Sequence, residues 1–302
     1  MSNIGLAFVN PAPLTKPELV VNFAKKCEAM GAHSMWTIDR IAYDNLEPLT
    51  ILGAAAGATQ KIRLGTSVLL PALRHPALLA KIVATLDFIS NGRITLGVGF
   101  GSRESDFTAV EVPYEGRGSR VVESVQLMKR LWTEENVTHK GRFFNIQNLT
   151  LGPRPVQQPH PPIFTGGTAE VVLKRAGTWA NGFICGSSAI QDFSSTWEKI
   201  SQYARAAGRD PKEIEKAGLT FMAINDDKAK AVETIAAYVQ RYYGRARGDL
   251  EKTCVVGPPT ACADTIHAFL SRGLDTLIIG VADPDPRQLD SFGEKVMPKL
   301  KS

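Results

Sequence analysis

Residues 62–100, IRLGTSVLLPALRHPALLAKIVATLDFISNGRITLGVGF, decide the fold of this chain. The stretch opens with a β-type apolar run at Ile62–Leu70 and continues with a helical pattern at Pro76–Ser90. It then returns to a β-type run at Arg93–Phe100. A strand, a helix and a second strand in this order predict two parallel strands joined by a crossover helix.

The same alternation extends to both ends of the chain. Upstream, strands are expected at Ile4–Val9 and Ser34–Ile38, with helices at Lys16–Met30 and Glu47–Thr59. Downstream, the pattern predicts strands at Pro161–Thr165, Gly182–Cys185, Ala217–Ile224 and Leu274–Gly280, a hairpin at Asn136–Gly152, and helices at Arg117–Glu134, Ala169–Gly177, Ser194–Ala207, Lys228–Tyr243 and Thr260–Arg272.

Eight such strands without an interior linker predict an α/β fold, a (β/α)₈ TIM barrel with insertions, formed as one domain over residues 1–302. The main alternative is a doubly wound sheet, which carries a phosphate-binding loop directly after its first strand. Here the first strand runs into Asn10-Pro11-Ala12-Pro13, which cannot form such a loop. The barrel is therefore favoured.

Composition and charge narrow the class of protein. The chain has 302 residues, 44% of them hydrophobic, and a formal net charge of +5. Lysines and arginines are dispersed among acids, so no basic cluster predicts a nucleic-acid partner. No apolar run reaches the roughly 20 residues that span a bilayer, and the start lacks the pattern of a signal peptide. A cytoplasmic protein with a small-molecule substrate is expected, and the positive net charge favours an anionic one.

Metal and hydrolase signatures are missing from the sequence. The five histidines stand apart, and there is no H-E-x-x-H, P-loop or G-x-S-x-G motif. No metal site is therefore expected. The cysteines share no metal-binding or redox spacing and are interpreted as buried free thiols; they are Cys27, Cys185, Cys254 and Cys262.

Function in a barrel resides where the strands end at the C-terminal face. Gly97-x-Gly99-x-Gly101 ends the fourth predicted strand, but Ser102 stands where a dinucleotide fingerprint needs its third glycine. Close backbone packing is one interpretation of these glycines, and close approach of a flat ring is the other. Gly166-Gly167-Thr168 follows a strand and opens a helix, so its backbone N–H groups and the helix dipole favour phosphate. A plain turn capped by Thr168 is the alternative.

Charged residues stand at two more strand ends. Asp39-Arg40 ends the second predicted strand, where the pair could be structural or could face a ligand. Glu104 and Asp106 follow the fourth strand, where they could serve as acid or base, or simply belong to an acidic surface loop.

Several separate motifs together resemble the bacterial luciferase-like monooxygenase superfamily. They occur in the order of that family from about Ile4 to Gly280: Leu64-Gly65-Thr66-Ser67-Val68-Leu69, Arg74-His75-Pro76-Ala77, Ala84-Thr85-Leu86-Asp87, Gly92-Arg93-Ile94-Thr95-Leu96-Gly97-Val98-Gly99, Arg117-Gly118-Ser119-Arg120, Pro153-Arg154-Pro155-Val156-Gln157, Pro161-Pro162-Ile163, Gly166-Gly167 and Ala180-Asn181-Gly182.

The resemblance implies a barrel that binds FMN or the deazaflavin coenzyme F420 at its C-terminal mouth. In many relatives a bulge with a non-proline cis peptide follows the third strand and supports the ring, and the matching residues are Ser67 and Val68. This Ser-Val pair resembles that of F420-using relatives. The family's phosphate contacts match Gly166, Gly167 and Thr168, in agreement with the helix-terminus argument. We also include Asp39 and Gly99 among the expected cofactor contacts.

Two positions depart from the family pattern. Many relatives have Asp-His at the end of the second strand, where this chain has Asp39-Arg40. A guanidinium stays charged and is a poor acid or base, so Arg40 is expected to orient an anionic substrate or stabilise negative charge. The glucose-6-phosphate dehydrogenases of the family carry Glu where this chain has Ser102, which disfavours that activity.

The resulting expectation is a flavin-dependent oxidoreductase, with oxygenation by reduced FMN and O₂ ahead of hydride transfer by F420. Arg40 and Glu104 are its expected catalytic residues. A separate flavin or F420 reductase would supply reduced cofactor. The alternative to an enzyme is a non-catalytic barrel that only binds flavin. The apolar helix Pro76–Asp87 also predicts a homodimer or higher homo-oligomer through this region; its apolar residues are Leu78, Leu79, Ile82, Val83 and Leu86.

Overall fold

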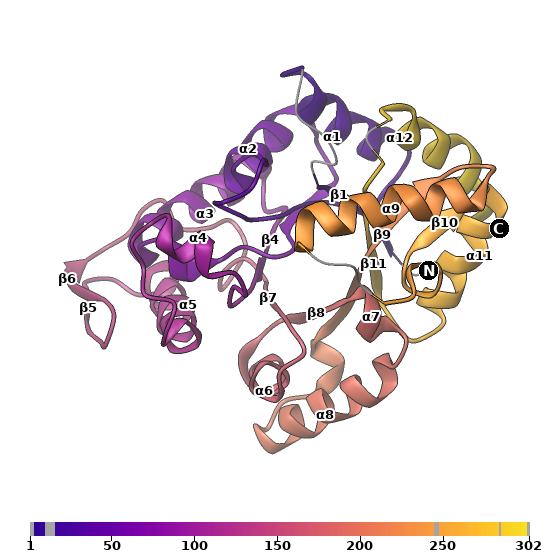
Figure 1. The fold of residues 1–302 in the computed structure, drawn as a ribbon. Coiled ribbons are helices and arrows are strands. Elements are labelled where there is room, and N and C mark those ends of the chain that lie inside the picture. The colour runs from indigo at the N-terminus through magenta and orange to yellow at the C-terminus, as the bar shows by residue number, and fades with distance from the viewer. Residues whose placement is uncertain (1–2, 10–15, 245–247, 284, 301–302) are drawn as a thin grey trace.

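A closed parallel β-barrel forms the centre of the molecule (Figure 1). In this computed structural model, residues 3–9, 16–244, 248–283 and 285–300 are described. The barrel strands follow one another around the ring back to the first: β1 (Asn3–Phe8), β2 (Ser34–Thr37), β3 (Arg63–Thr66), β4 (Ile94–Val98), β7 (Ile163–Gly166), β8 (Gly182–Gly186), β9 (Glu215–Ile224) and β11 (Thr276–Val281). The TIM barrel predicted from the sequence is confirmed.

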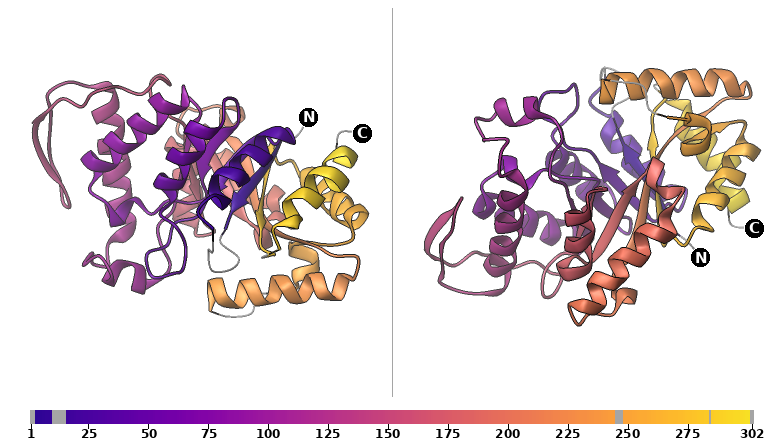
Figure 2. Two further views of the ribbon diagram at one scale, coloured as in Figure 1. Left: turned by 90° about the horizontal axis from the view of Figure 1, so that it is seen from above. Right: turned by 60° about the horizontal axis from the view of Figure 1, so that its bottom comes forward.

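Helices alternate with these strands and cover the outside of the ring (Figure 2). The longer ones are α1 (Leu19–Ala29), α2 (Pro48–Ala58), α3 (Pro76–Ser90), α5 (Arg117–Thr133), α6 (Glu170–Trp179), α8 (Phe193–Ala206), α9 (Lys228–Tyr243) and α11 (Pro259–Leu270). Each matches a helix that the sequence predicts, within a few residues at either end.

Between α5 and β7 the chain leaves the ring. There β5 (Val137–Lys140) and β6 (Asn145–Leu149) form the predicted hairpin, which projects beside α5 (Figure 2). The sequence analysis missed several short elements: α4 (Glu104–Thr108), α7 (Ser187–Ile190), α10 (Leu250–Thr253), β10 (Val255–Gly257), α12 (Arg287–Ser291) and α13 (Met297–Leu300). They are too short to show a hydrophobic period.

The third strand is shorter than the sequence predicts. It ends at Thr66, and only Leu69 continues the sheet, through a single bridge to Val98. A short 3₁₀ turn at Pro71–Leu73 follows. The prediction extended the strand because an apolar run alone does not distinguish a strand from a buried loop. The expected loop at Asn10–Pro13 lies outside the described residues.

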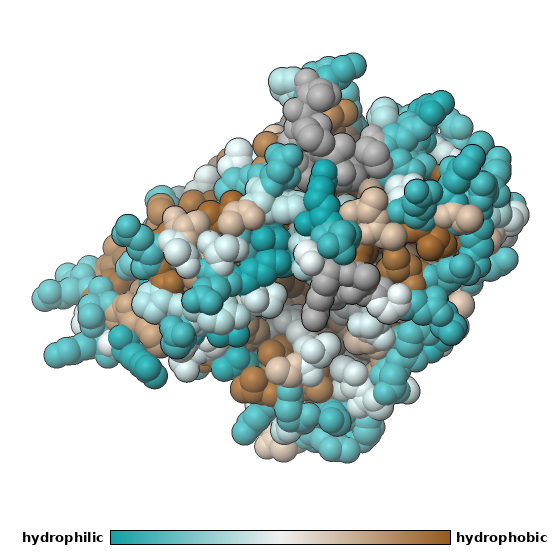
Figure 3. Space-filling model, in the orientation of Figure 1, coloured by the Kyte–Doolittle hydropathy of each residue, from teal (hydrophilic) through white to brown (hydrophobic). Residues whose placement is uncertain are grey.

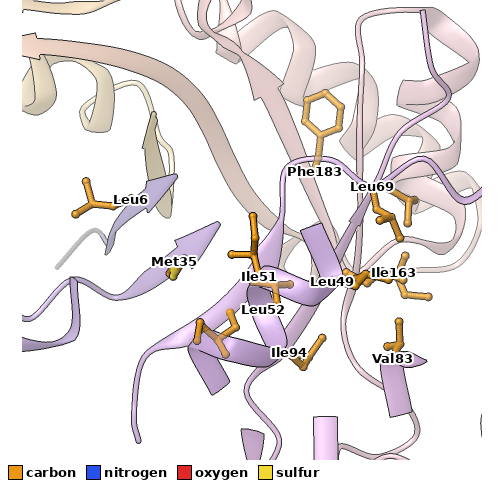
Figure 4. Close-up of a cluster of buried hydrophobic side chains, with 14 of the residues drawn as sticks. Leu6, Met35, Leu49, Ile51, Leu52, Leu69, Val83, Ile94, Ile163 and Phe183 are labelled. Atoms are coloured by element: carbon orange, nitrogen blue, oxygen red, sulfur yellow. The ribbon is translucent and has the colours of Figure 1, made fainter. Parts of the chain in front are cut away.

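A hydrophobic layer separates the outer helices from the sheet. Figure 4 shows side chains of the strands, such as Met35 and Ile94, meeting helix residues such as Leu52 and Val83. All four are buried. Burial of this kind is the dominant favourable contribution to folding, at about 25 cal/mol per Å² of apolar surface.

The inside of the barrel is filled as well. The indole of Trp36 occupies the space that glycines leave free on the strands to either side of β2. A Cβ at Gly5 would lie 2.7 Å from Trp36 Nε1, and one at Gly65 would lie 2.5 Å from its ring. At the N-terminal ends of their strands, Arg63 and Glu215 form an ion pair of 2.7 Å. A charged pair therefore joins β3 and β9 across the N-terminal end of the barrel.

Candidate functional site

A cavity of about 810 Å³ lies at the carboxyl ends of the strands. Its walls come from the segments after β2, β3, β4, β7 and β8, and from the last turn of α9. A volume in this range suits a ligand of coenzyme size. Of the residues expected in the site, the cavity brings together Asp39, Arg40, Ser67, Val68, Gly99, Gly166, Gly167 and Thr168.

The segment after β3 forms one wall. The peptide bond between Ser67 and Val68 is cis, as the family resemblance implies. The Ser67 hydroxyl is buried and has no hydrogen-bond partner in the protein. Opposite it, a Cβ at Gly99 would lie 2.3 Å from Val68 Cγ2, so glycine is needed for the two strand ends to approach each other. A buried, unpartnered hydroxyl in a cavity is the feature expected where a polar ligand binds.

The loop after β7 supplies a second wall with free donors. Gly167 has a φ of 143°, a conformation that favours glycine. The N-cap of α6 is Ala169, and no side chain caps the helix. Thr168 therefore does not cap α6, and the alternative of a plain capped turn is disfavoured. No side chain occupies the first-turn N–H groups, although the one of Val172 donates to the Ala169 carbonyl at 2.8 Å. The start of the helix can therefore still donate to an anion, which the helix dipole also favours.

Asp39 lies in the cavity wall but is held by the protein. Its carboxylate accepts hydrogen bonds from Arg74 Nη1 at 2.6 Å and from the Leu70 N–H at 2.8 Å. Arg74 also contacts Glu47 at 2.9 Å. Burial raises the pKa of the Asp39 carboxyl, and the bonds from Arg74 and Leu70 offset part of that rise. Asp39 thus fixes the chain after β3.

Arg40 is also held by the protein. Its Nε donates to Asp106 Oδ2 at 2.8 Å, Nη1 to the Tyr242 carbonyl at 3.2 Å and Nη2 to the Ala42 carbonyl at 3.3 Å. Its side chain is only 7% exposed. Every guanidinium nitrogen therefore has a protein partner, which leaves less capacity to bind a substrate anion than the sequence analysis expects.

The two acidic residues after β4, Glu104 and Asp106, both lie on α4 but on opposite sides of it. Asp106 is buried against Arg40, and its Oδ1 accepts from the N–H groups of Ile41 and Ala42 at 2.9 and 2.8 Å. Glu104 lies on the exposed side of the same helix and does not line the cavity. The structure therefore does not bring Glu104 to the other expected site residues.

Several cavity residues were missed by the sequence analysis. Phe221 on β9 and the pair Tyr242 and Tyr243 on α9 line the cavity with aromatic rings. Of these three aromatic residues, only Phe221 could have been assigned to the site from the sequence, because it lies near the end of a predicted strand. Cys185 on β8 also lines the cavity, where burial raises its pKa to about 12 and keeps the thiol neutral.

The described residues contain neither a metal-binding cluster nor a membrane-spanning helix. No group of three or more His, Cys, Asp or Glu side chains in them is arranged to hold a metal ion. None of the helices formed by these residues is long and apolar enough to cross a membrane.

Comparison with known proteins now adds to this geometry. The family model described as luciferase-like monooxygenase matches residues 6–276. This chain belongs to the luciferase-like monooxygenase family. Similar curated members include an F420-dependent glucose-6-phosphate dehydrogenase of Kineococcus radiotolerans, 34% identical, with 94% of each chain covered. Another is the FMNH(2)-dependent dimethylsulfone monooxygenase of Pseudomonas putida, 26% identical, covering 84% of this chain and 78% of the relative.

A solved structure of the family has the same architecture. The monooxygenase RslO1 from Streptomyces bottropensis superposes with a TM-score of 0.84 at 25% identity, covering 98% of this chain and 99% of that one. The luciferase-like family contains both monooxygenases and dehydrogenases, and its members are oxidoreductases.

Proposed function

We propose that this luciferase-like protein is an oxidoreductase that binds a flavin-type coenzyme in the cavity at the barrel mouth. The unpartnered Ser67 hydroxyl and the uncapped start of α6 line the same cavity and carry this proposal. The Ser67 hydroxyl can form a hydrogen bond with a polar edge of the coenzyme ring. The N–H groups at the start of α6 can donate to its phosphate.

The residues present fit such a coenzyme. Val68 and Gly99 would lie against the ring, and Gly166, Gly167 and Thr168 would hold the phosphate. Bound F420 exchanges a hydride with its substrate, whereas bound reduced FMN reacts with O₂. The chain itself orients the ring through the segment that Asp39 fixes to Arg74. Phe221, Tyr242 and Tyr243 line the other side of the cavity and would exclude water from a bound ring.

F420 becomes our first candidate for this coenzyme, with hydride transfer as the reaction, in the reverse of the order expected from the sequence. The F420-dependent relative from Kineococcus radiotolerans covers 94% of this chain. The Ser67-Val68 pair also resembles that of F420-using relatives. Reduced FMN with O₂ is the second candidate, favoured by the dimethylsulfone monooxygenase and by RslO1. A separate flavin or F420 reductase would supply reduced coenzyme. The activity on glucose 6-phosphate stays disfavoured by Ser102.

Binding measurements with both coenzymes test the proposal. The purified protein is titrated with F420 and with FMN, in oxidised and reduced forms, and the absorbance and mass of any copurifying coenzyme are recorded. Micromolar or tighter binding of one of them supports the proposal. Failure to bind either coenzyme contradicts it. Binding without turnover over a panel of substrates would instead identify a flavin-binding barrel.

We also propose a cytoplasmic homodimer in which α3 contributes to the interface. Leu78 near the start of α3, and Phe88 and Ile89 near its end, are more than half exposed. Val156, which lies against the turn after α3, is also exposed. Leu79, Val83 and Leu86, which the sequence analysis assigned to this surface, are buried in the core instead. In Figure 3 hydrophobic residues are visible on the side of the molecule where α2 and α3 lie. Exposed apolar side chains at both ends of one helix favour association.

A further inference from the structure

The last turn of α9 is tied to the barrel by two arginines from distant parts of the chain. The Tyr242 carbonyl accepts a hydrogen bond from Arg103 Nη2 at 2.9 Å and another from Arg40 Nη1 at 3.2 Å. Arg40 follows β2, and Arg103 follows β4. Carbonyls in the last turn of a helix lack an intrahelical partner, and cations are favoured there by the helix dipole. The two guanidiniums therefore cap α9 from outside the helix.

The same two arginines also contact the tyrosine rings. Arg103 Cζ lies 4.8 Å from the centre of the Tyr242 ring and 5.3 Å from that of Tyr243. Arg40 Cζ lies 5.7 Å from the Tyr242 ring and 5.2 Å from the Tyr43 ring. Cation–π contacts at these distances add to the hydrogen bonds, so the side chains are held as well as the backbone.

Asp106 fixes the direction of Arg40. It pairs with Arg40 Nε, and its other oxygen binds the backbone after Arg40. Both side chains of the pair are almost fully buried, at 7% and 2% exposed. A buried pair held by additional hydrogen bonds has one geometry, which turns Nη1 of Arg40 toward α9.

The last turn of α9, which these contacts hold, faces the cavity. Tyr242 and Tyr243 line it together with Phe221, whose ring centre lies 6.4 Å from that of Tyr243. Figure 1 shows α9 crossing the front of the barrel, with one end near the centre of the view and toward α4. We call these three rings the aromatic wall.

We propose that Arg40 and Arg103 are positioning residues that hold the aromatic wall over the coenzyme and keep water away from its ring. This inference rests on the proposed function. It gives Arg40 a role that acts through Tyr242, in place of direct contact with a substrate anion.

The test measures how well the bound coenzyme is shielded. F420 or FMN is bound at saturation, and quenching of coenzyme fluorescence by acrylamide is recorded. Acrylamide is neutral, so the loss of a positive charge does not bias its approach. The variants are Arg40→Met, Arg103→Met and Arg40→Lys, and the matched control is Arg130→Met, because Arg130 pairs with Glu134 on the surface of α5.

We expect the quenching constant to rise about threefold or more in both Met variants, because each loses a charge-assisted bond to the Tyr242 carbonyl. Coenzyme affinity should change less, and Arg40→Lys should restore part of the shielding because it keeps the charge without the planar fork. A residue with only a structural role would change the melting temperature and leave quenching as it is.

The outcomes separate the two proposals. If the wild type binds coenzyme and both Met variants shield it as well as the wild type, the inference is overturned and the proposed function stands. If the wild type binds neither coenzyme, both are overturned. Should Arg40→Met fail to fold, Arg103→Met decides alone, since Arg103 is only partly buried.

Discussion

At the scale of single residues, the phosphate end of the cavity depends on the absence of a side chain at Gly167. Its φ of 143° strains any other residue, so a test of charge needs two variants that share this strain. Gly167→Asp and Gly167→Asn are nearly equal in size and differ in charge. We expect the Asp variant to bind F420 or FMN about tenfold more weakly than the Asn variant, because a carboxylate repels the phosphate.

Coenzyme titrations of both variants give this ratio. Equal affinities in the two variants would place the phosphate elsewhere.

Lys129 predicts a pH-dependent stability. Burial lowers its pKa from 10.5 to about 8, with a smaller contribution from Arg209, while Nζ donates to the Trp179 carbonyl at 3.0 Å. Between these two values the folded chain binds fewer protons than the unfolded chain. The cost of the buried charge is therefore fully present below pH 8 and is relieved as the pH rises toward 10.5.

Lys129→Met keeps the aliphatic stem and removes the charge. We expect it to stabilise the protein on the order of 1 kcal/mol at pH 7, since partial exposure screens the effect, and to lose this advantage at high pH. Urea unfolding of both proteins at several pH values measures the difference. A difference that is constant with pH would show that Lys129 is not the titrating group.

At the scale of elements, the hairpin of β5 and β6 is attached to α5 through Glu123. Its carboxylate accepts from the N–H groups of Phe143 and Phe144 and from His139 Nε2. Burial opposes ionisation, yet these bonds outweigh it and lower the pKa of Glu123. This stabilisation is therefore present above the ordinary value of 4.5 and is lost as the pH falls through the lowered pKa.

Glu123→Gln should therefore speed hydrogen exchange in residues 137–149 at pH 7 and destabilise the protein by about 1–3 kcal/mol. The stability difference should vanish at the acid end, where both side chains are neutral. Glu134→Gln is the matched control, because Glu134 pairs with Arg130 at the surface. Unchanged exchange in the hairpin would show that the apolar contacts of Phe143 and Phe144 are sufficient.

The parts of the site that could be predicted from the sequence are those that depend on a local pattern of strands and helices. The glycines at 166–167 could, because a strand end followed by a helix start indicates an anion site from the sequence alone. Tyr242 could not, because its place in the wall depends on contacts with Arg40 and Arg103, which are far away in the sequence. The short third strand was missed because Val68, Leu69 and Leu70 are equally apolar in a loop and in a strand.

The motifs that carry the family resemblance are largely structural. Arg93 donates to the carbonyls of Ala56, Thr59, Ile62 and Ser90 and so joins α2 to the start of β4. Asp87, which is fully buried, accepts from the backbone and the side chain of Gln157. These motifs therefore predict the barrel well. They do not identify the substrate, because Arg93, Asp87 and Gln157 lie outside the cavity wall, and the motif residues that do line it, such as Ser67 and Val68, are assigned to the coenzyme.

At the scale of the whole molecule, the apolar surface of α3 predicts an oligomer. Light scattering at micromolar concentration should give a mass above the 32.8 kDa of one chain. Leu78→Glu combined with Ile89→Glu should shift the protein to the monomer, because burial of like, unpaired charges opposes association. Val171→Glu, at an exposed apolar position on α6, is the control and should leave the mass unchanged. If the wild-type protein instead has the mass of one chain, the proposed oligomer is wrong.

The ion pair between Arg63 and Glu215 has a consequence for how ligands reach the cavity. Because this pair lies at the N-terminal end of the barrel and Trp36 fills the space beside Gly5 and Gly65, ligands are expected to reach the cavity from its open side at the carboxyl ends of the strands. Entry and exit therefore share one opening. If the proposed coenzyme binds in the inner part of that opening, it must arrive before a small substrate and leave after its product, so steady-state kinetics should follow a compulsory order of binding.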